Sequence, residues 1–518
     1  MPDFKNKLYT GRVLTVALFI VLSVAGFGFS IYLFYVANSI YMYMLAIAFT
    51  ILSAAAGFFN IYASIWYYRS FYYEKHLAGI KSTLKQIEKY PTVALIVPMY
   101  NEDPAMVENN ITELKRMNYD KKKFRIYVAD DSTDENIVSS MEEMSKRLKF
   151  KYIHRTERVG YKAGAINNVV KNHTKEDFIA IFDADENLAD KNFILDMLPY
   201  FQNEKLCYVQ TEKRYTKGNF FSDSVDIFDA FFFRFIQPAR AMSNTAVFAG
   251  SCGLIRRDAF TDIGGFPEYV IEDTFFSFES DMHGWESLYV PHVYARGRPI
   301  RTFTELTKQQ WRYNYGDTQF ISYFYKKQGW KKSRSPLATM EYVAHGFGLN
   351  YLSVVLIFFT LISVGIVFST VPFAHINFWQ FIETNKIQED LELLGFFAFS
   401  LSLLTPVFLT KVYFGSWSKG LMVFLLNYAL AFVRTKAALA TIIKINPGAN
   451  WNRLKMLTNS KNKIIASLRS TKFEVGFALL LFALAYTALS ESNIAGGAWL
   501  GWFGVLYSLS TVFTLKYG

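Results

Sequence analysis

The chain has 518 residues, of which 52% are hydrophobic and 18% aromatic, and its 55 basic and 44 acidic residues give a formal net charge of +11. No Asp, Glu, Lys or Arg occurs from Val13 to Tyr68 or from Tyr342 to Ile382. Runs of this length exclude an ordinary soluble protein, because a membrane-spanning helix needs about 20 apolar residues. The two cysteines are too few for a disulfide scaffold.

The basic excess does not indicate nucleic acid. A membrane chain with this charge balance is attracted to anionic lipid headgroups, and its sequence contains no nucleic-acid recognition motif. We therefore expect a lipid bilayer as a partner and no nucleic acid.

The first apolar run predicts two membrane helices, near 13–36 and 40–68, with a tight turn between them. Basic residues flank this pair on both sides: Lys5, Lys7 and Arg12, then Arg69 and Lys75. Positive flanks favour the cytoplasm. The sequence thus predicts an N-terminal transmembrane hairpin over residues 1–68 and a cytoplasmic block over 69–341.

Within residues 69–341, short apolar runs alternate with stretches of helical length. The predicted strands are 93–97, 124–129, 152–154, 178–182 and 208–210, and the predicted helices are 102–118, 134–149, 161–173 and 191–203. This alternation predicts a Rossmann-like α/β domain with a mostly parallel sheet. Ligands of such sheets bind beyond the carboxyl ends of the strands.

Polar side chains follow three of these strands: Tyr100 and Glu102, then Asp130 and Asp131, then Asp183 and Asp185. Asp183 and Asp185 are one residue apart, so both carboxylates can reach one Mg²⁺ or Mn²⁺ ion. A single Asp-x-Asp is more often a solvated turn, but the acidic and polar residues at the other strand ends favour a metal site.

Three further motifs carry charged or aromatic groups. Lys162, between Gly160 and Gly164 at the start of a predicted helix, suits a diphosphate. Asp273, after Glu272, is either a general base or an acid that helps to start a helix. The segment Gln309, Gln310, Trp311, Arg312 and Tyr313 reads most simply as an amphipathic helix at the membrane surface.

The C-terminal region, 342–518, predicts four more spans, near 346–371, 393–410, 474–490 and 494–515. An acidic loop that begins at Glu383 is expected outside the cell. We interpret 421–443 as an interfacial helix, because seven basic residues in 444–473 would otherwise be external. The prediction is a multi-pass protein of the cell membrane with about six spans and both termini cytoplasmic.

In this order the motifs resemble those of the membrane-embedded family 2 glycosyltransferases, the group of the cellulose and hyaluronan synthases and other processive β-glycan synthases. The matching elements are Asp130-Asp131, Lys162-Ala163-Gly164, Asp183-Ala184-Asp185, Val209-Gln210-Thr211, Glu272-Asp273 and Gln309 to Tyr313. Three positions depart from the family pattern: Tyr313 replaces a tryptophan, Ile271 a threonine, and Phe248 to Cys252 alters a Phe-Cys-Gly-Ser element.

The resemblance implies a GT-A fold and an inverting, metal-dependent hexosyltransferase that uses a UDP-sugar. Asp273, with Glu272, would be catalytic, and Gln309 to Tyr313 would bind the acceptor or the leaving diphosphate. The donor would be bound by Tyr100, Glu102, Asp130, Asp131, Lys162 and Asp183, and the metal by Asp183 and Asp185. Residues 444–473, with Asn450 to Arg453, resemble a gating loop.

Three functions remain open at this point. The first is a processive synthase that extends, and probably exports, a β-linked polysaccharide, and the second is a non-processive enzyme that glycosylates a membrane lipid. The third is a transporter or scaffold whose soluble domain senses nucleotide. The complete acidic set argues against the third, since a sensor does not need Asp273 beside a metal pair.

Overall fold

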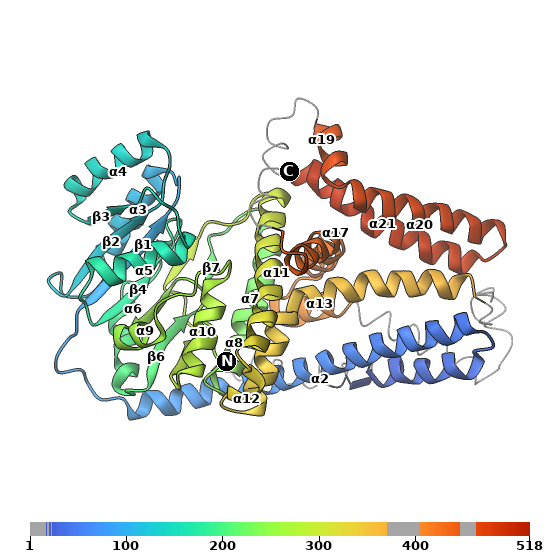
Figure 1. Cartoon of the computed structure of the whole chain (residues 1–518), viewed down its shortest axis with the longest axis horizontal. Helices are drawn as coiled ribbons and strands as arrows, with labels where there is room; N and C mark the ends of the chain where they lie inside the picture. Colours follow the sequence, from blue (N-terminus) through green and yellow to red (C-terminus); the bar gives the residue numbers. More distant parts are fainter. Residues whose placement is uncertain (1–16, 18–19, 22, 370–403, 446–462) are drawn as a thin grey trace.

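The computed structural model describes residues 17, 20–21, 23–369, 404–445 and 463–518. Figure 1 shows an α/β part, built on a seven-stranded sheet, and a group of long helices that extends away from it. The sheet positions the candidate site, and the long helices carry the apolar sequence.

The main sheet has the strand order β3-β2-β1-β4-β8-β6-β9. Its strands are β1 (Val93–Met99), β2 (Phe124–Asp130), β3 (Lys151–His154), β4 (Phe178–Ile181), β6 (Leu206–Thr211), β8 (Gly253–Arg256) and β9 (Glu286–Val290). β8 runs antiparallel to β4 and β6, and the other neighbouring pairs are parallel. The five predicted strands are confirmed, in a mixed sheet with one reversed strand.

Strand β1 shows why this sheet is buried on both faces. All seven of its residues are buried. Val93, Leu95 and Val97 belong to one apolar core, and Ala94 and Ile96 belong to another on the opposite face, because successive side chains of a strand point to opposite sides. The uninterrupted apolar run is therefore a central strand covered by helices.

Helices and a small second sheet complete the α/β part. Its helices are α3 (Pro104–Leu114), α4 (Glu135–Leu148), α5 (Tyr161–His173), α6 (Phe193–Met197), α7 (Phe220–Phe231), α8 (Gln237–Ala241), α9 (Arg257–Ile263) and α10 (Glu272–Met282), with a 3₁₀ turn at Leu198–Gln202 and a π turn at Phe232–Ile236. The second sheet, ordered β5-β10-β7, comprises β5 (Asn187–Leu188), β7 (Arg214–Tyr215) and β10 (Ala295–Gly297).

Helix α2 (Ile40–Thr83) continues without a break past residue 68, where we placed the end of the membrane hairpin. Its last third leaves the apolar sequence and packs against the α/β part (Figure 1): Tyr73 and Leu77 join the same core as Val93. The Tyr73 hydroxyl donates a hydrogen bond to the carbonyl oxygen of Tyr289 in β9. The apolar first part of α2 and the α/β part are thus joined by one continuous helix.

The remaining helices follow the α/β part. They are α11 (Phe303–Lys326), α12 (Gly329–Lys332), α13 (Pro336–Val367), α16 (Thr405–Phe414), α17 (Trp417–Ile442), α19 (Lys463–Ser470), α20 (Lys472–Ser490) and α21 (Ile494–Tyr517). In Figure 1 α17 is seen nearly end-on, whereas α2, α13, α20 and α21 run across the view. Helix α17 therefore crosses the direction of the long helices.

Among the described residues, α17, α20 and α21 are long and apolar enough to cross a membrane. The two parts of α13, Pro336–Gly348 and Leu352–Val367, are bent by 62° and would make a fourth span if they count as one. This finding agrees with a membrane protein but does not reach the six predicted spans, and it counts α17, which the sequence analysis interpreted as interfacial, among the candidate spans. The predicted span near 393–410 lies mostly outside the described residues, as does the acidic loop before it.

Helix α11 brings the Gln309–Tyr313 segment against the start of α10. Thr302 and Glu305 form a capping box that begins α11. A Cβ atom at Gly316 would lie 2.6 Å from Ile271 Cγ1. Only glycine permits this approach of the two helices.

We expect Gly316→Ala to lower the midpoint of thermal unfolding of the purified protein, because overpacking typically costs about 1–3 kcal/mol and exceeds the gain of about 1 kcal/mol in helix propensity. Gly79→Ala in α2 is the matched control, since a Cβ atom there would meet nothing within 4 Å. Equal midpoints for the two variants would contradict the close contact.

Candidate active site

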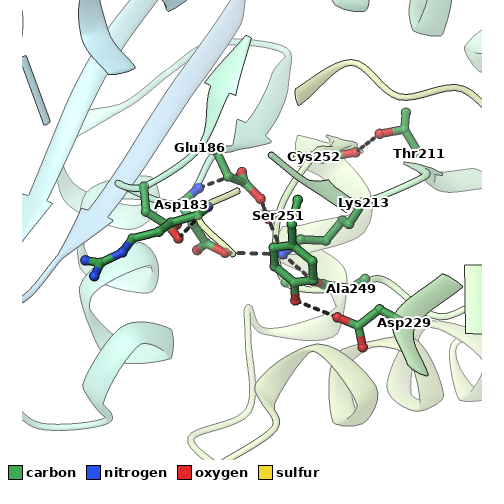
Figure 2. A network of polar contacts seen from close by, with 12 residues as sticks. Asp183, Glu186, Thr211, Lys213, Asp229, Ala249, Ser251 and Cys252 are labelled. Atoms are coloured by element: carbon green, nitrogen blue, oxygen red, sulfur yellow. Dashed lines mark hydrogen bonds and ion pairs between the residues drawn. The ribbon is translucent and has the colours of Figure 1, made fainter. Parts of the chain in front are cut away.

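The carboxyl ends of β4 and β6 bring acidic and basic side chains together (Figure 2). Asp183 follows β4, and its Oδ1 accepts a hydrogen bond from Lys162 Nζ at 2.5 Å. Lys213 follows β6, and its Nζ lies 3.3 Å from Asp183 Oδ2. Partial burial alone would raise the pKa of Asp183, but the two lysines hold it well below its usual range.

Asp185 and Glu102 lie close enough to Asp183 for their charges to repel. The pKa of Asp185 is raised by burial and by Asp183, and the pKa of Glu102 by burial and by both aspartates. Among the described residues, no group of three or more His, Cys, Asp or Glu side chains could hold a metal ion. Asp183 and Asp185 carry oxygen atoms of the kind that divalent cations bind, and both oxygens of Asp183 contact lysines here.

Glu186, which the sequence analysis did not select, is the buried member of this acidic run. Its Oε2 accepts a hydrogen bond from the backbone N–H of Asp183 at 2.9 Å, and its Oε1 accepts one from Ser251 Oγ at 2.6 Å. Lys213 Nζ lies 3.4 Å from Oε1. Glu186 therefore fixes the turn that carries Asp183 and ties it to the loop before β8.

Asp130 and Asp131 are held by neighbouring protein groups. Asp130 Oδ2 accepts a hydrogen bond from Tyr152 Oη at 2.5 Å, and Asp130 Oδ1 accepts one from the N–H of Ser132. Asp131 forms a two-pronged ion pair with Arg155, at 2.8 and 2.7 Å. These contacts hold the predicted donor-binding pair at the carboxyl end of β2.

Tyr100, which the sequence analysis predicts to bind the donor, stacks on a guanidinium group. Arg158 Cζ lies 3.4 Å from the centre of its ring. Arg158 stands just before Gly160 and α5, whose first turn carries Lys162. The stack therefore joins the end of β1 to the loop that presents Lys162.

Glu272 and Asp273 form the first turn of α10. Burial and the adjacent Asp273 raise the pKa of Glu272 to about 7, and burial also raises the pKa of Asp273. Lys162 Nζ lies 4.0 Å from Glu272 Oε1. Gly250 has a φ of 78°, and a Cβ atom there would lie 3.1 Å from Asp273 Oδ2 and 3.6 Å from Lys162 Nζ. This glycine leaves room between the acid and the lysine.

The Gln309–Tyr313 segment divides between two surroundings. Arg312 lies 5.6 Å from the centre of the Tyr313 ring and is among the cations that lower the pKa of Glu272 and Asp273. Gln309 donates a hydrogen bond to Tyr313 Oη at 3.3 Å. These side chains face the acidic pair.

Gln310 and Trp311 face α17 instead. Gln310 Oε1 accepts a hydrogen bond from Arg434 Nε at 2.9 Å, and Trp311 packs against Ala437 and Ala440. Most of the predicted gating segment, 444–473, lies outside the described residues.

The Glycosyl transferase family 2 model matches residues 94–264. The chain is 28% identical over 242 residues to the cellulose synthase catalytic subunit of Pseudomonas fluorescens, covering 45% of this chain and 32% of that protein. It is 29% identical over 258 residues to glucomannan 4-beta-mannosyltransferase 1 of Cyamopsis tetragonoloba, covering 47% and 48%. It is 27% identical over 267 residues to beta-monoglucosyldiacylglycerol synthase of Trichormus variabilis, covering 49% and 53%. The chain thus spans about half or less of the length of these relatives.

Among solved structures, the chain is similar to the mannosyltransferase PcManGT from Pyrobaculum calidifontis in complex with GDP-Man and Mn²⁺. The TM-score is 0.51 at 15% identity, over 83% of this chain and 100% of that one. At this identity the similarity shows the fold, a GT-A-like α/β domain with a mixed sheet.

The raised pKa of Glu272 predicts a pH-dependent stability. The folded protein binds this proton more tightly than the unfolded chain, so the stabilisation is complete below pH about 4.5 and is lost as the pH rises through about 7. Glu272→Gln imitates the protonated form. Its unfolding midpoint should therefore rise relative to wild type between pH 5 and pH 8, whereas Glu204→Gln, at an exposed glutamate, should follow wild type. Parallel profiles for all three proteins would refute the assignment.

Proposed function

We propose that this protein is a membrane-bound, inverting hexosyltransferase. It uses a UDP-sugar to extend a β-linked polysaccharide and translocates that polysaccharide across the membrane. The proposal starts from the match of the Glycosyl transferase family 2 model to residues 94–264. One observation carries the proposal. Lys162 lies 2.5 Å from Asp183 and 4.0 Å from Glu272, so a single cation joins the Asp-x-Asp turn to the Glu-Asp turn. A donor diphosphate at Lys162 would lie beside both.

In the proposed reaction, Asp273 accepts the proton of an acceptor hydroxyl. The hydroxyl oxygen then forms a bond to the anomeric carbon of the donor, on the side opposite the diphosphate, while the bond from that carbon to the phosphate oxygen breaks. The nucleoside diphosphate leaves with the electron pair of that bond. The raised pKa of Asp273 makes it a better base than an exposed aspartate.

Positive groups around the leaving diphosphate support this chemistry. Lys162 and Arg312 would hold the phosphates, and Tyr100, Glu102, Asp130 and Asp131 would shape the nucleoside pocket. Asp183 and Asp185 would hold Mg²⁺ or Mn²⁺, which when bound neutralises charge on the departing diphosphate.

We assign the acceptor to the side of Asp273 that faces away from the donor diphosphate. Tyr313 offers a flat ring for a sugar, and its contact with Gln309 keeps it near Arg312. Gln310 and Trp311 would support this segment from α17. The acceptor side is thereby connected to the membrane helices.

The proposed topology follows the charge pattern. Residues 1–68 form the N-terminal membrane hairpin, 69–341 the cytoplasmic catalytic domain, and 342–518 the C-terminal membrane region of a multi-pass protein of the cell membrane. The crossing direction of α17 in Figure 1 supports an interfacial helix near 421–443. Residues 444–473 would be the gating loop, and both termini would be cytoplasmic.

A second function is a glycolipid synthase that adds sugar to a membrane lipid. The similarity to beta-monoglucosyldiacylglycerol synthase favours it, because that match covers 49% of this chain, as much as the matches to polymer synthases. The same donor site and base serve both functions.

Product size distinguishes the two. Purified protein in lipid vesicles is given labelled UDP-glucose, UDP-N-acetylglucosamine or GDP-mannose with Mg²⁺ or Mn²⁺. We expect label from one UDP-sugar in a polymer that is insoluble in organic solvent. Label that extracts as a lipid with one or two sugars would replace the synthase by the glycolipid enzyme, and transfer from none of these donors would refute both.

Asp273→Asn should bind UDP as the wild type does but lose about 10²–10⁴-fold in turnover, because the amide cannot accept the proton. Turnover with the labelled donor and UDP binding by calorimetry check the two parts. Asp262→Asn, at an exposed aspartate near the end of α9, is the control and should keep its turnover. Near wild-type turnover of Asp273→Asn would mean that Asp273 serves only to start α10.

A further inference from the structure

Lys213 is a charged group of the site that neither the motifs nor the proposed reaction uses. It lies between β6 and β7, where the chain passes from the main sheet to the small one. Figure 2 shows its side chain at the centre of the polar network, directed at Asp183, Glu186 and Ala249. The side chain is 24% exposed, so a bound ligand can reach it.

The two lysines hold Asp183 differently. Lys162 makes one short contact with Asp183, at 2.5 Å. Lys213 Nζ makes three longer ones, 3.3 Å to Asp183 Oδ2, 3.4 Å to Glu186 Oε1 and 3.4 Å to the carbonyl oxygen of Ala249. Ordinary N–H···O hydrogen bonds are about 2.9 Å long. The ammonium group of Lys213 is therefore shared among three oxygens without a close partner.

The positions of the carboxylates do not depend on Lys213. Glu186 is already held by the backbone N–H of Asp183 and by Ser251 Oγ, at 2.9 and 2.6 Å. Asp185 Oδ2 accepts a hydrogen bond from the N–H of Arg298 at 3.2 Å. A purely structural role for Lys213 would therefore duplicate contacts that are present.

The two lysines also occupy both oxygens that Asp183 would offer to a cation. A divalent ion on Asp183 would have to displace the ammonium groups from these oxygens. Lysine carries its charge on a flexible four-carbon stem and readily takes a new partner. The nearest new partner would be the diphosphate that the ion holds.

We infer that Lys213 is a diphosphate-binding residue, which turns from Asp183 and Glu186 to the phosphates of the nucleotide when a divalent ion takes its place on Asp183. This inference rests on the proposed nucleotide-sugar donor. It assigns Lys213 two opposite effects, competition with the metal in the absence of nucleotide and attraction of the diphosphate in its presence.

The test uses the full-length protein in detergent, with Lys213→Gln, Lys213→Arg and the control Lys205→Gln, an exposed lysine before the start of β6. Calorimetry measures UDP and UMP binding with Mn²⁺ present. Lys213→Gln should weaken UDP binding roughly ten- to hundredfold, the range for one hydrogen bond to a charged group, and leave UMP binding unchanged. Lys213→Arg keeps the charge and should retain the preference for UDP.

Electron paramagnetic resonance of free Mn²⁺ supplies the second measurement. Without nucleotide, Lys213→Gln should bind Mn²⁺ more tightly than wild type, because a competing ammonium group is gone. A loss of UMP as well as UDP affinity, or weaker Mn²⁺ binding, would show a structural role and overturn the inference. Wild-type UDP affinity in Lys213→Gln would overturn it too, whereas a wild-type protein that binds no UDP would refute the UDP-sugar donor itself.

Discussion

An excess of partly buried carboxylates over cations is the constraint on which this site depends. The acids of the site outnumber its cations: Glu102, Asp183, Asp185, Glu186, Glu272 and Asp273 lie against Lys162, Lys213, Arg298 and Arg312. Carboxylates that lie close together repel one another and raise one another's pKa values. The main sheet and helix α10 hold them together despite this repulsion. This surplus of negative charge favours the binding of a cation, such as the metal ion proposed above. Electrostatic repulsion of this kind lowers the stability of the fold, and functional sites commonly trade stability for function in this way.

The sequence predicts the strand ends well because their signals are local. Buried runs such as β1 and the acids that follow β4 are adjacent in the chain, and the parallel order of the first strands then brings them to one edge. Lys213 and Glu186 have no local signal. They meet because β8 inserts antiparallel between β4 and β6 and brings the loop before it, Ala249 to Cys252, against both. Hydrophobic periodicity does not encode the order of strands in a sheet.

The predicted boundary at residue 68 lies inside the continuous helix α2. Apolar length marks the first part of α2, but the charges from Arg69 onward suggested that the helix ends there. The structure shows the helix continuing because Tyr73 and Leu77 are buried in the α/β core. A helix with one apolar face can leave the bilayer and remain folded when a second domain covers that face.

Buried guanidinium groups extend this coupling to the Gln309–Tyr313 segment. A buried charge is costly unless hydrogen bonds satisfy it, and Arg434 of α17, which is 0% exposed, donates to Gln310 Oε1 and Asn427 Oδ1. Arg240, also 0% exposed, donates to the backbone carbonyl of Glu341 in α13. Movement of α17 or α13 would therefore break hydrogen bonds of side chains that are shielded from solvent. The position of the Gln309–Tyr313 segment is thus set by α17 as much as by the α/β part, so the proposed acceptor would be placed relative to both.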